Sequence, residues 1–265
     1  MIPRQKTRME MDRRDFLLKS AAFLSGSLLG LNSLSRALAC DEPIHKSKIA
    51  IIIDDIGPSR SRLKQFLDIG VPITFAILPR YSQSPILAQE IHCKGHEIML
   101  HQPMEPFNSR LDPGPGAVYV GDDPYKIVSV IGENISDIPF VTGINNHMGS
   151  RFTSCQKEME EALTAVKMRG LFFVDSLTTN LSKAYKTAKQ MHVATACRNI
   201  FLDNDPVESI ILSQLYELKR LALSSGYAIG IGHPYPETAR AIQSFLKGLK
   251  KSNISMVYIS SLIPA

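Results

Sequence analysis

The sequence predicts an α/β protein whose single domain is an irregular (β/α) barrel of about seven parallel strands. Short apolar runs rich in β-branched residues alternate with longer segments whose apolar residues recur at helical spacing. Polar or ionisable residues follow most of the apolar runs. A repeating strand–helix order places helices outside a parallel sheet, and seven or eight such units favour a closed sheet over an open one.

Each predicted strand is a short segment bounded by polar or turn-forming residues. The first consists of four isoleucines and one alanine, which is typical of a strand that is covered on both faces. In chain order, the predicted strands are Ile49–Ile53, Ile73–Leu78, Glu97–Leu100, Phe140–Ile144, Leu171–Val174, Tyr227–Ile231 and Ile254–Ile259.

Helices are predicted between the strands, where apolar residues recur every three or four positions. They are Ser59–Asp68, Ser84–Lys94, Gln156–Met168, Pro206–Ser224 and Pro236–Lys250. Arg198 and the segment Asp203-Asn204-Asp205 cluster before the fourth helix, and we interpret them as capping of that helix at Asp205-Pro206. Residues 101–124, rich in proline and glycine, form the longest irregular segment, and a loop of this length usually has a function.

Most of the positive charge lies at the start of the chain. The formal net charge of the 265 residues is +5, but residues 1–39 hold seven basic and three acidic side chains. Residues 40–265 therefore carry a net charge of only +1. A body this close to neutral has no electrostatic basis for binding a polyanion, so we expect no nucleic-acid partner.

Residues 1–39 are predicted to be a signal peptide for the twin-arginine export machinery. Residues 12–19, DRRDFLLK, contain Arg13 and Arg14 in the loose pattern R-R-x-F-L-x-K. The weakly apolar run that follows is shorter than the roughly 20 residues that span a bilayer. An A-x-A cleavage pattern ends at Ala39. We expect a periplasmic or exported protein with a linker over residues 40–47 and no permanent transmembrane segment.

Two alternatives remain open for this leader. A conventional secretory signal also has positive charge ahead of an apolar run. Cys40 would follow the cleavage site, where a lipid anchor is attached in lipoproteins. Position 37 is alanine rather than the leucine of a lipoprotein signal, so release as a soluble protein is favoured.

Ionisable and amide side chains gather directly after the predicted strands. They are Asp54, Asp55, His101, Asn145, Asn146, His147, Asp175 and His233. The carboxyl ends of the strands in a parallel barrel share one rim, so these side chains are expected to meet there. A single such residue is commonly a helix cap. Ionisable side chains at five strand ends of one rim, however, cost desolvation free energy and do not stabilise the fold in exchange. We therefore expect a functional site at this rim.

The mixture of carboxylates and histidines indicates a divalent metal such as zinc. Zinc takes about three His and carboxylate ligands and leaves a position for water. Successive strand side chains alternate in direction, so Asp54 and Asp55 are expected to point different ways. One would bind the metal, while the other would accept a proton from water whose pKa the metal lowers.

Five segments resemble the divergent polysaccharide deacetylase family, which is related to the NodB-type carbohydrate esterases. They are IIIDDIG (51–57), GHEIMLHQPMEP (95–106), GINNHMGSRFT (143–153), FFVDS (172–176) and IGIGHP (229–234). The resemblance covers roughly residues 48–262, and we assign the family's domain to residues 48–265. It implies an irregular (β/α) barrel, a divalent metal and the removal of N-acetyl groups from sugar polymers.

The resemblance also implies roles for the first rim residues. Asp54 matches the general base, and Asp55 matches the metal-binding aspartate. His101 matches the first histidine of the motif H-[ST]-x-x-H, whose second histidine is replaced by Glu105. We favour His147 as the replacement metal ligand. Glu105 is either an alternative ligand or a residue that contacts a ligand rather than the metal itself.

The remaining roles concern proton transfer to the leaving group and contact with the substrate. His233 matches the late histidine that acts as general acid, and Asp175 matches the region whose carboxylate orients it. Asn146, Arg151 and Tyr235 are expected to contact the substrate. The family's tryptophan near this region has no counterpart, because the chain contains none.

Together these features predict a metal-dependent hydrolase, with zinc as the favoured metal. Its expected reaction removes an acyl group, most simply N-acetyl, from an envelope carbohydrate polymer or oligosaccharide. The alternative is a non-catalytic periplasmic member of the same fold that binds a glycan or a protein. The missing second histidine and tryptophan favour the alternative, whereas the retained base and acid favour the enzyme.

Overall fold

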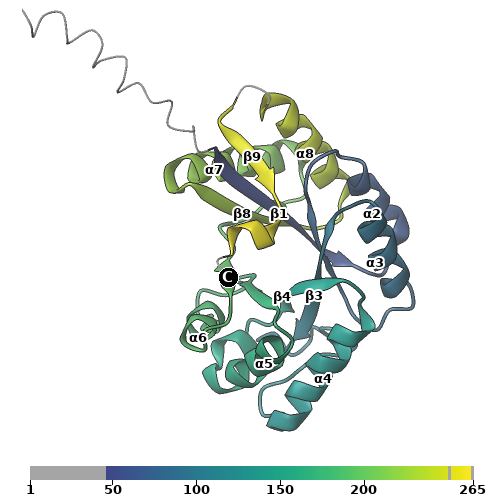
Figure 1. The fold of residues 1–265 in the computed structure, drawn as a ribbon, viewed down its shortest axis with the longest axis vertical. Helices are drawn as coiled ribbons and strands as arrows, with labels where there is room; N and C mark the ends of the chain where they lie inside the picture. Colours follow the sequence, from purple (N-terminus) through teal and green to yellow (C-terminus); the bar gives the residue numbers. More distant parts are fainter. Residues whose placement is uncertain (1–45, 250–251, 264–265) are drawn as a thin grey trace, which may run out of the picture. The chain divides into compact units, whose positions relative to one another are not determined.

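A parallel sheet of nine strands forms the centre of the domain in the computed structural model, which describes residues 46–249 and 252–263 (Figure 1). The predicted signal peptide, Cys40 and all but the last two residues of the linker lie outside the described residues. Within the described ranges, no helix is both long enough and apolar enough to cross a membrane.

All the predicted strands are present, and two short ones are added. The strands are β1 (Ser47–Ile56), β2 (Thr74–Ile77), β3 (Glu97–Met104), β4 (Val141–Met148), β5 (Phe172–Asp175), β6 (Thr195–Cys197), β7 (Ile200–Phe201), β8 (Tyr227–Gly232) and β9 (Ile254–Val257). The additional strands, β6 and β7, contain only three and two residues. Runs this short carry too little hydrophobic pattern to be predicted.

The strand order makes the sheet an irregular barrel. Along the sheet the order is β6-β5-β4-β3-β2-β1-β8-β7, and β9 pairs with β1. The two end strands, β6 and β7, are consecutive in the chain, so the sheet curls until residues 198 and 199 join its ends. Arg198 N–H donates to Asp175 O on one side of this junction, and Asn199 N–H donates to Ile229 O on the other. The predicted fold class is thereby confirmed.

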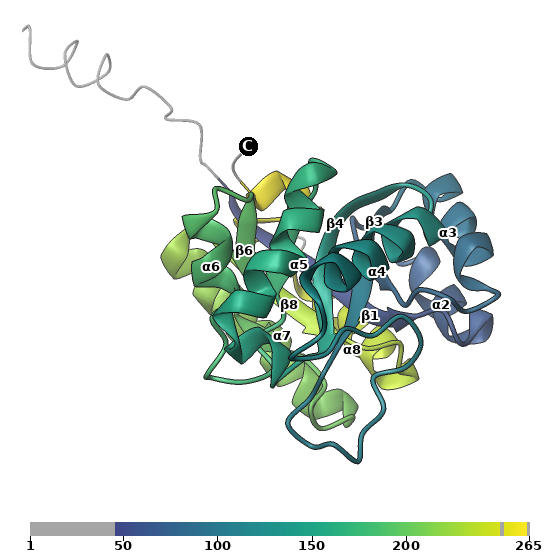
Figure 2. The same ribbon diagram turned by 90° about the horizontal axis from the view of Figure 1, so that it is seen from below.

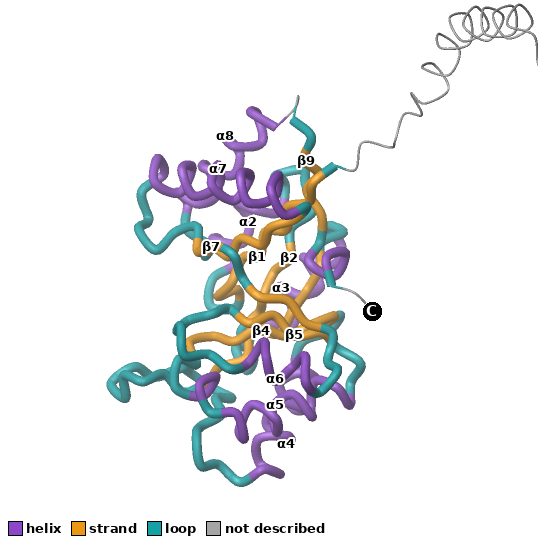
Figure 3. The backbone as a smooth tube through the Cα atoms, turned by 90° about the vertical axis from the view of Figure 1, so that its left-hand side faces the viewer, coloured by secondary structure: helices purple, strands orange, loops and turns teal. Residues whose placement is uncertain are grey.

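Helices surround the sheet (Figures 2 and 3). They are α2 (Arg60–Leu67), α3 (Ser84–Cys93), α4 (Pro124–Asp137), α5 (Gln156–Met168), α6 (Ala184–Gln190), α7 (Glu208–Ser225) and α8 (Pro236–Leu249), with 3₁₀ turns η1 (Phe152–Ser154) and η2 (Ile259–Leu262). Sequence analysis did not identify α4 and α6. The first of these begins at a cap, since the Asp123 carboxylate accepts from the N–H groups of Tyr125 and Lys126.

The two faces of the strands bury two apolar clusters. On β1, Ile49, Ile51 and Ile53 pack toward the helices, whereas Ala50 and Ile52 belong to the cluster inside the barrel. This separation follows from the alternation of side chains along a strand. The inner cluster fills the barrel, so polar groups are confined to its ends.

The loop from Glu105 to Asp123 projects from the body of the domain before α4 (Figure 2). Two fully buried amides fix its base. Gln102 donates to Gly116 O, and Asn134 donates to both Gly116 O and the Gln102 side chain. The loop is therefore attached to the scaffold by hydrogen bonds within the protein interior.

Candidate metal centre and active site

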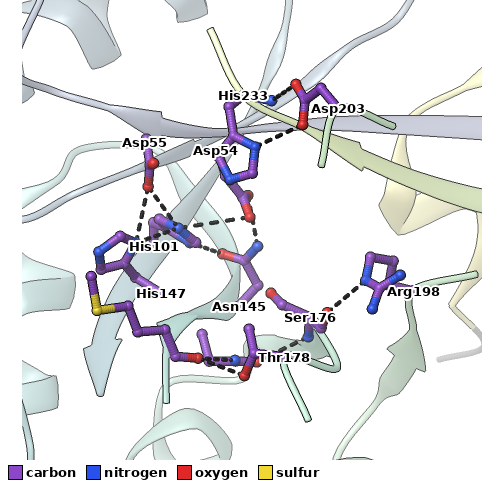
Figure 4. Close-up of polar contacts among 12 residues, drawn as sticks. Asp54, Asp55, His101, Asn145, His147, Ser176, Thr178, Arg198, Asp203 and His233 are labelled. Carbon is purple, nitrogen blue, oxygen red and sulfur yellow. Dashed lines mark hydrogen bonds and ion pairs between the residues drawn. The ribbon is translucent and has the colours of Figure 1, made fainter. Parts of the chain in front are cut away.

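The polar side chains at the barrel rim continue the inward-facing rows of the strands. On β1 the inner cluster contains Ala50 and Ile52, and Asp54 is the next inward position. The same alternation gives the other inward positions of the rim, which are His101, Asn145, His147, Ser176, Arg198 and His233. They come from the ends of six strands, β1, β3, β4, β5, β6 and β8, and Figure 4 shows that they converge.

Two of them, His101 and His147, form a compact triangle of metal-ligating atoms with Asp55. Asp55 Oδ1 lies 3.2 Å from His101 Nε2 and 2.9 Å from His147 Nδ1, and the two histidine nitrogens are 3.1 Å apart. Asp55 Oδ1 is buried and accepts no hydrogen bond within the described part of the chain. An unpartnered carboxylate oxygen that faces two imidazole nitrogens at this spacing fits a divalent metal with one carboxylate and two histidine ligands.

A buried amide sets the tautomer of His101. Asn145 Nδ2 donates to Asp54 Oδ1 at 2.8 Å, which leaves Asn145 Oδ1 to accept from His101 Nδ1 at 2.7 Å. The proton of a neutral His101 therefore resides on Nδ1, and the lone pair on Nε2 faces the triangle. Asn145 was predicted at the rim without a role, because an amide carries no charge that would mark it as a proton donor or a metal ligand.

The backbone at Asp55 brings two adjacent carboxylates to the same imidazole. Asp55 has a left-handed backbone with φ of 56°, and the pairing of β1 with β2 is irregular between Ile53 and Ile56. As a result, His101 Nε2 lies 3.7 Å from Asp54 Oδ2 as well as 3.2 Å from Asp55 Oδ1. The expectation that the two carboxylates point different ways is corrected here, because the left-handed residue interrupts the strand alternation.

The two carboxylates have opposite electrostatic environments. Burial raises the pKa of Asp54, although His101 and His233 act in the opposite direction. Burial would also raise the pKa of Asp55, but the adjacent imidazoles of His101 and His147 outweigh it and lower that pKa. Asp54 is thus the carboxylate suited to accept a proton, and Asp55 is the one held as an anion.

Glu105 lies apart from the triangle, in a separate ion pair. Its Oε1 accepts from Arg151 Nη1 at 2.8 Å, and its Oε2 accepts from the N–H of Val120 at 2.8 Å. The Oε1 bond thus connects the projecting loop to the segment after β4, while the Oε2 bond holds the loop together. Of the two candidates to replace the motif's second histidine, His147 is the one that the structure places with Asp55 and His101.

On the other side of Asp54, His233 is held by Asp203. His233 Nδ1 donates to Asp203 Oδ1 at 2.8 Å, and Asp203 Oδ2 accepts from the His233 N–H and from Thr238 Oγ1. Burial lowers the pKa of His233, but the hydrogen bond and charge of Asp203 raise it overall to about 9. With Nδ1 committed to Asp203, Nε2 is the nitrogen available for proton transfer.

Asp203 therefore has the orienting role that sequence analysis gave to Asp175. The Asp175 carboxylate instead accepts from Leu177 N–H, Ser182 Oγ and Tyr185 N–H. Its neighbour Val174 faces the inner cluster, so alternation turns Asp175 away from the rim. The interpretation of Asp205-Pro206 as the helix cap is also wrong, because α7 begins at Glu208 and its N-cap residue, Val207, makes no side-chain cap.

The three predicted substrate contacts have different surroundings. Asn146 is buried and bonds main-chain groups, donating to Met148 O and accepting from Ser176 N–H. Arg151 pairs with Glu105, with its side chain half exposed. The Tyr235 ring is 5.8 Å from the His233 ring, and this places Tyr235 beside the site.

Comparison with known proteins identifies relatives over most of the chain. A family model described as divergent polysaccharide deacetylase matches residues 51–263. The uncharacterized protein YibQ of Escherichia coli K12 is 33% identical over 227 residues, which cover 85% of this chain and 70% of YibQ. An uncharacterized protein of Haemophilus influenzae Rd is 31% identical over 228 residues, which cover 86% of this chain and 81% of that protein.

Solved structures share the fold. An uncharacterized protein from Agrobacterium tumefaciens C58 matches with a TM-score of 0.78 and 26% identity, covering 82% of this chain and 89% of that one. A structure described as T48 deacetylase with substrate matches with a TM-score of 0.51 and 14% identity, covering 82% and 90%. The second match concerns the fold alone. Given the match over residues 51–263, the chain belongs to the divergent polysaccharide deacetylase family.

Proposed function

We propose that this protein is a metal-dependent hydrolase that removes the acyl group, most simply N-acetyl, from an N-acylated carbohydrate. One observation carries the proposal. The triangle of Asp55, His101 and His147 lies beside a buried carboxylate, Asp54, while His233 approaches that carboxylate with its other nitrogen fixed by an aspartate. A metal site flanked by a base and an acid is the arrangement that amide hydrolysis needs.

Asp55, His101 and His147 would hold the metal, and zinc is the favoured ion for two imidazoles and one carboxylate. When bound, a divalent metal supplies Lewis-acid polarisation of the acyl carbonyl and lowers the pKa of water. The chain supplies the proton transfers. Asp54 accepts a proton as the water oxygen forms its bond to the acyl carbon. Burial raises the pKa of Asp54 and makes this carboxylate a better base than an exposed aspartate.

His233 completes the reaction on the leaving-group side. Its raised pKa of about 9 keeps the imidazole protonated at neutral pH, so it enters the reaction as an acid. The proton on Nε2 passes to the amine nitrogen as the carbon–nitrogen bond breaks. One proton has then moved to Asp54 and one has left His233, and exchange with solvent restores both groups.

The proposed setting is the cell envelope. The twin-arginine pattern at Arg13 and Arg14 supports export of a folded protein, which would let the metal be acquired before export. The substrate would then be an envelope glycan or an oligosaccharide derived from one. This setting rests on the sequence of the leader and on the carbohydrate-directed family.

The direct test is acetate release from an N-acetylglucosamine oligosaccharide by the zinc-loaded full chain. We expect turnover that a chelator stops and that added zinc restores. Replacing Asp54 by asparagine is expected to keep the metal and to lower kcat/KM by about 10²–10⁴, since it removes the base. Asp205→Asn, which changes an exposed carboxylate outside the site, is the matched control and should behave as wild type.

The non-catalytic alternative predicts different results in the same assay. Its support is the replacement of the motif's second histidine by Glu105, which is bonded to Arg151 rather than to the triangle. A non-catalytic binding protein would release no acetate at any metal loading. An Asp54→Asn protein that binds metal and keeps wild-type turnover would contradict the role given to Asp54.

A further inference from the structure

Two inward positions of the rim have no part in the chemistry described so far. Phe172 and Val174 face the inner cluster on β5, which makes Ser176 the next inward residue. Ala196 faces the same cluster on β6, which makes Arg198 the next inward residue there. Figure 4 shows both residues on the side of Asn145 that lies away from Asp55 and His147.

Ser176 presents a buried hydroxyl without a partner. The residue is 1% exposed, and its Oγ makes no hydrogen bond within the described ranges. Its main chain is fixed, because its N–H donates to Asn146 Oδ1 and its carbonyl accepts from Arg198 Nε. A buried hydroxyl that lacks a partner is unfavourable, and a polar atom of a bound ligand would satisfy it.

Arg198 presents a fixed positive charge that forms no direct ion pair with a carboxylate of the described residues. Its Nε donates to Ser176 O at 2.7 Å and its Nη2 to Leu177 O at 2.8 Å, while its guanidinium lies 3.7 Å above the Phe201 ring. Burial lowers the pKa of the guanidinium, although the charges of Asp175 and Asp54 act in the opposite direction. Main-chain carbonyls satisfy two nitrogens but carry no net charge, so Arg198 retains the capacity to bind an anion.

An aromatic ring connects this pair to the acid of the proposed reaction. The Phe201 ring that lies under Arg198 is also stacked against His233, with ring centroids 6.1 Å apart and planes 20° apart. His233 must face the nitrogen of the sugar in order to protonate it. Arg198 and Ser176 therefore lie on the sugar side of the scissile bond, away from the acyl group and from the metal triangle.

We propose that Arg198 and Ser176 form a subsite for an oxyanion on the sugar, so that the substrate is an acidic N-acyl sugar. This inference rests on the proposed function for the position of the sugar. A carboxylate and a phosphate both offer oxygens that a guanidinium and a hydroxyl bind together. The subsite would select sugars that bear either group over neutral ones.

The test compares three sugars with the zinc-loaded full chain. One is a neutral N-acetylglucosamine oligosaccharide, one contains N-acetylmuramic acid with its carboxylate, and one is N-acetylglucosamine 6-phosphate. We expect wild type to favour an acidic sugar, and the more active of the two identifies the group. Arg198→Gln should lower the ratio of kcat/KM for that sugar to kcat/KM for the neutral one by roughly 10- to 100-fold. Ser176→Ala should lower it by roughly 5-fold.

Two further variants separate charge from structure. Arg198→Lys keeps the charge but loses the planar fork, so its ratio should fall between those of wild type and Arg198→Gln. Arg169→Gln is the matched control, since Arg169 also donates to a main-chain carbonyl, that of Gly132, but at the outer helices. Its ratio should equal that of wild type. Equal losses on all three sugars, or a wild-type preference for the neutral sugar, would overturn the proposal.

A binding measurement separates this inference from the proposed function. Calorimetric titration of zinc-loaded Asp54→Asn protein, with and without Arg198→Gln, reports affinity without turnover. Absence of acetate release together with Arg198-dependent binding of an acidic sugar would reject the hydrolase and retain the subsite. Turnover of the neutral sugar together with acidic-sugar affinity that is independent of Arg198 would retain the hydrolase and reject the subsite.

Discussion

At the residue scale, two side chains to which the sequence assigned no catalytic role, Asn145 and Asp203, determine how the predicted ones act. Asn145 connects Asp54 to His101, and its amide orientation leaves a lone pair on His101 Nε2. Asp203 bonds His233 Nδ1, and this leaves Nε2 as the nitrogen that transfers a proton. A single carboxylate and a single amide thus fix the chemistry of two imidazoles.

Asp203→Asn tests the role of this carboxylate through the pH dependence of kcat/KM. The Asp203 charge raises the pKa of His233 to about 9, and without it we expect a pKa no higher than the ordinary value of about 6.5. Because the protonated imidazole is the active form, the alkaline loss of activity should move from about pH 9 to about pH 6.5. At pH 8 the protonated fraction should fall roughly 30-fold.

Asp175→Asn is the control that distinguishes the roles of the two aspartates. The alkaline loss of kcat/KM in this variant should stay near pH 9. An alkaline limb of the pH profile that moves in Asp175→Asn and stays in Asp203→Asn would restore the role first given to Asp175.

The His233–Asp203 pair also stabilises the fold. That stabilisation is complete below about pH 6.5 and is lost as the pH rises through about 9.

The sequence identifies those site residues that directly follow a long apolar run. Asp54 and Asp55 end a run of isoleucines, and His101 and His233 also follow recognisable strands. Asp203 escaped prediction because its strand, Ile200–Phe201, has only two residues and a proline-led helix start follows closely. The one available signal was strand alternation: Phe201 faces the inner cluster, so Asp203, two residues later, lies on the same face.

At the scale of elements, the strand ends that carry the site deviate from regular geometry. Asp55, Met148 and Leu177 have left-handed backbones, with φ of 56°, 52° and 48°. Each residue lies at or just beyond the carboxyl end of a strand that supplies the rim, and such a conformation costs about 1–2 kcal/mol in a residue other than glycine. Regular pairing elsewhere in the sheet holds these ends in place, and periodicity alone does not reveal them.

Gly143 on β4 tests the packing that supports the site. A Cβ at this position would lie 2.1 Å from the ring of Phe172, its partner on β5. Because backbone and ring cannot both remain in place, Gly143→Ala is expected to lower the free energy of unfolding by about 1–3 kcal/mol. Urea unfolding measures this change, and adding Phe172→Leu should recover part of it.

Gly132→Ala is the matched control within α4, where the nearest atom to a new Cβ is 3.7 Å away on a flexible arginine. It should stabilise the protein by about 0.5–1 kcal/mol, because alanine favours a helix more than glycine does. Equal effects of the two glycine substitutions would mean that contact with Phe172 does not constrain β4.

At the scale of the whole molecule, the site exists only when the barrel is complete. Its residues extend from Asp54 on β1 to His233 directly after β8, and the junction at residues 198 and 199 joins the two ends of the sheet. Alternating apolar runs and helices were sufficient to predict the barrel. The strand order and this junction depend on contacts between distant segments, which local periodicity does not encode.

The proposed twin-arginine export of the folded protein rests on Arg13 and Arg14 and is tested by replacing them. Replacing Arg13 and Arg14 by lysine should leave the folded, metal-loaded full chain in the cytoplasm of a bacterium with twin-arginine machinery. Cell fractionation measures the distribution, with Arg4→Lys and Arg8→Lys as the matched control that should still be exported. Export of the Arg13→Lys, Arg14→Lys protein at the wild-type level would reject this route.

The central claim is that the rim binds a divalent metal through Asp55, His101 and His147. Diffraction data from zinc-loaded crystals of the full chain, collected on both sides of the zinc absorption edge, test it most directly. We expect one anomalous difference peak at about 2.0–2.2 Å from Asp55 Oδ1, His101 Nε2 and His147 Nδ1, with Glu105 still paired with Arg151. A peak coordinated by Glu105, or the absence of a peak beside Asp54 at full zinc loading, would contradict the claim.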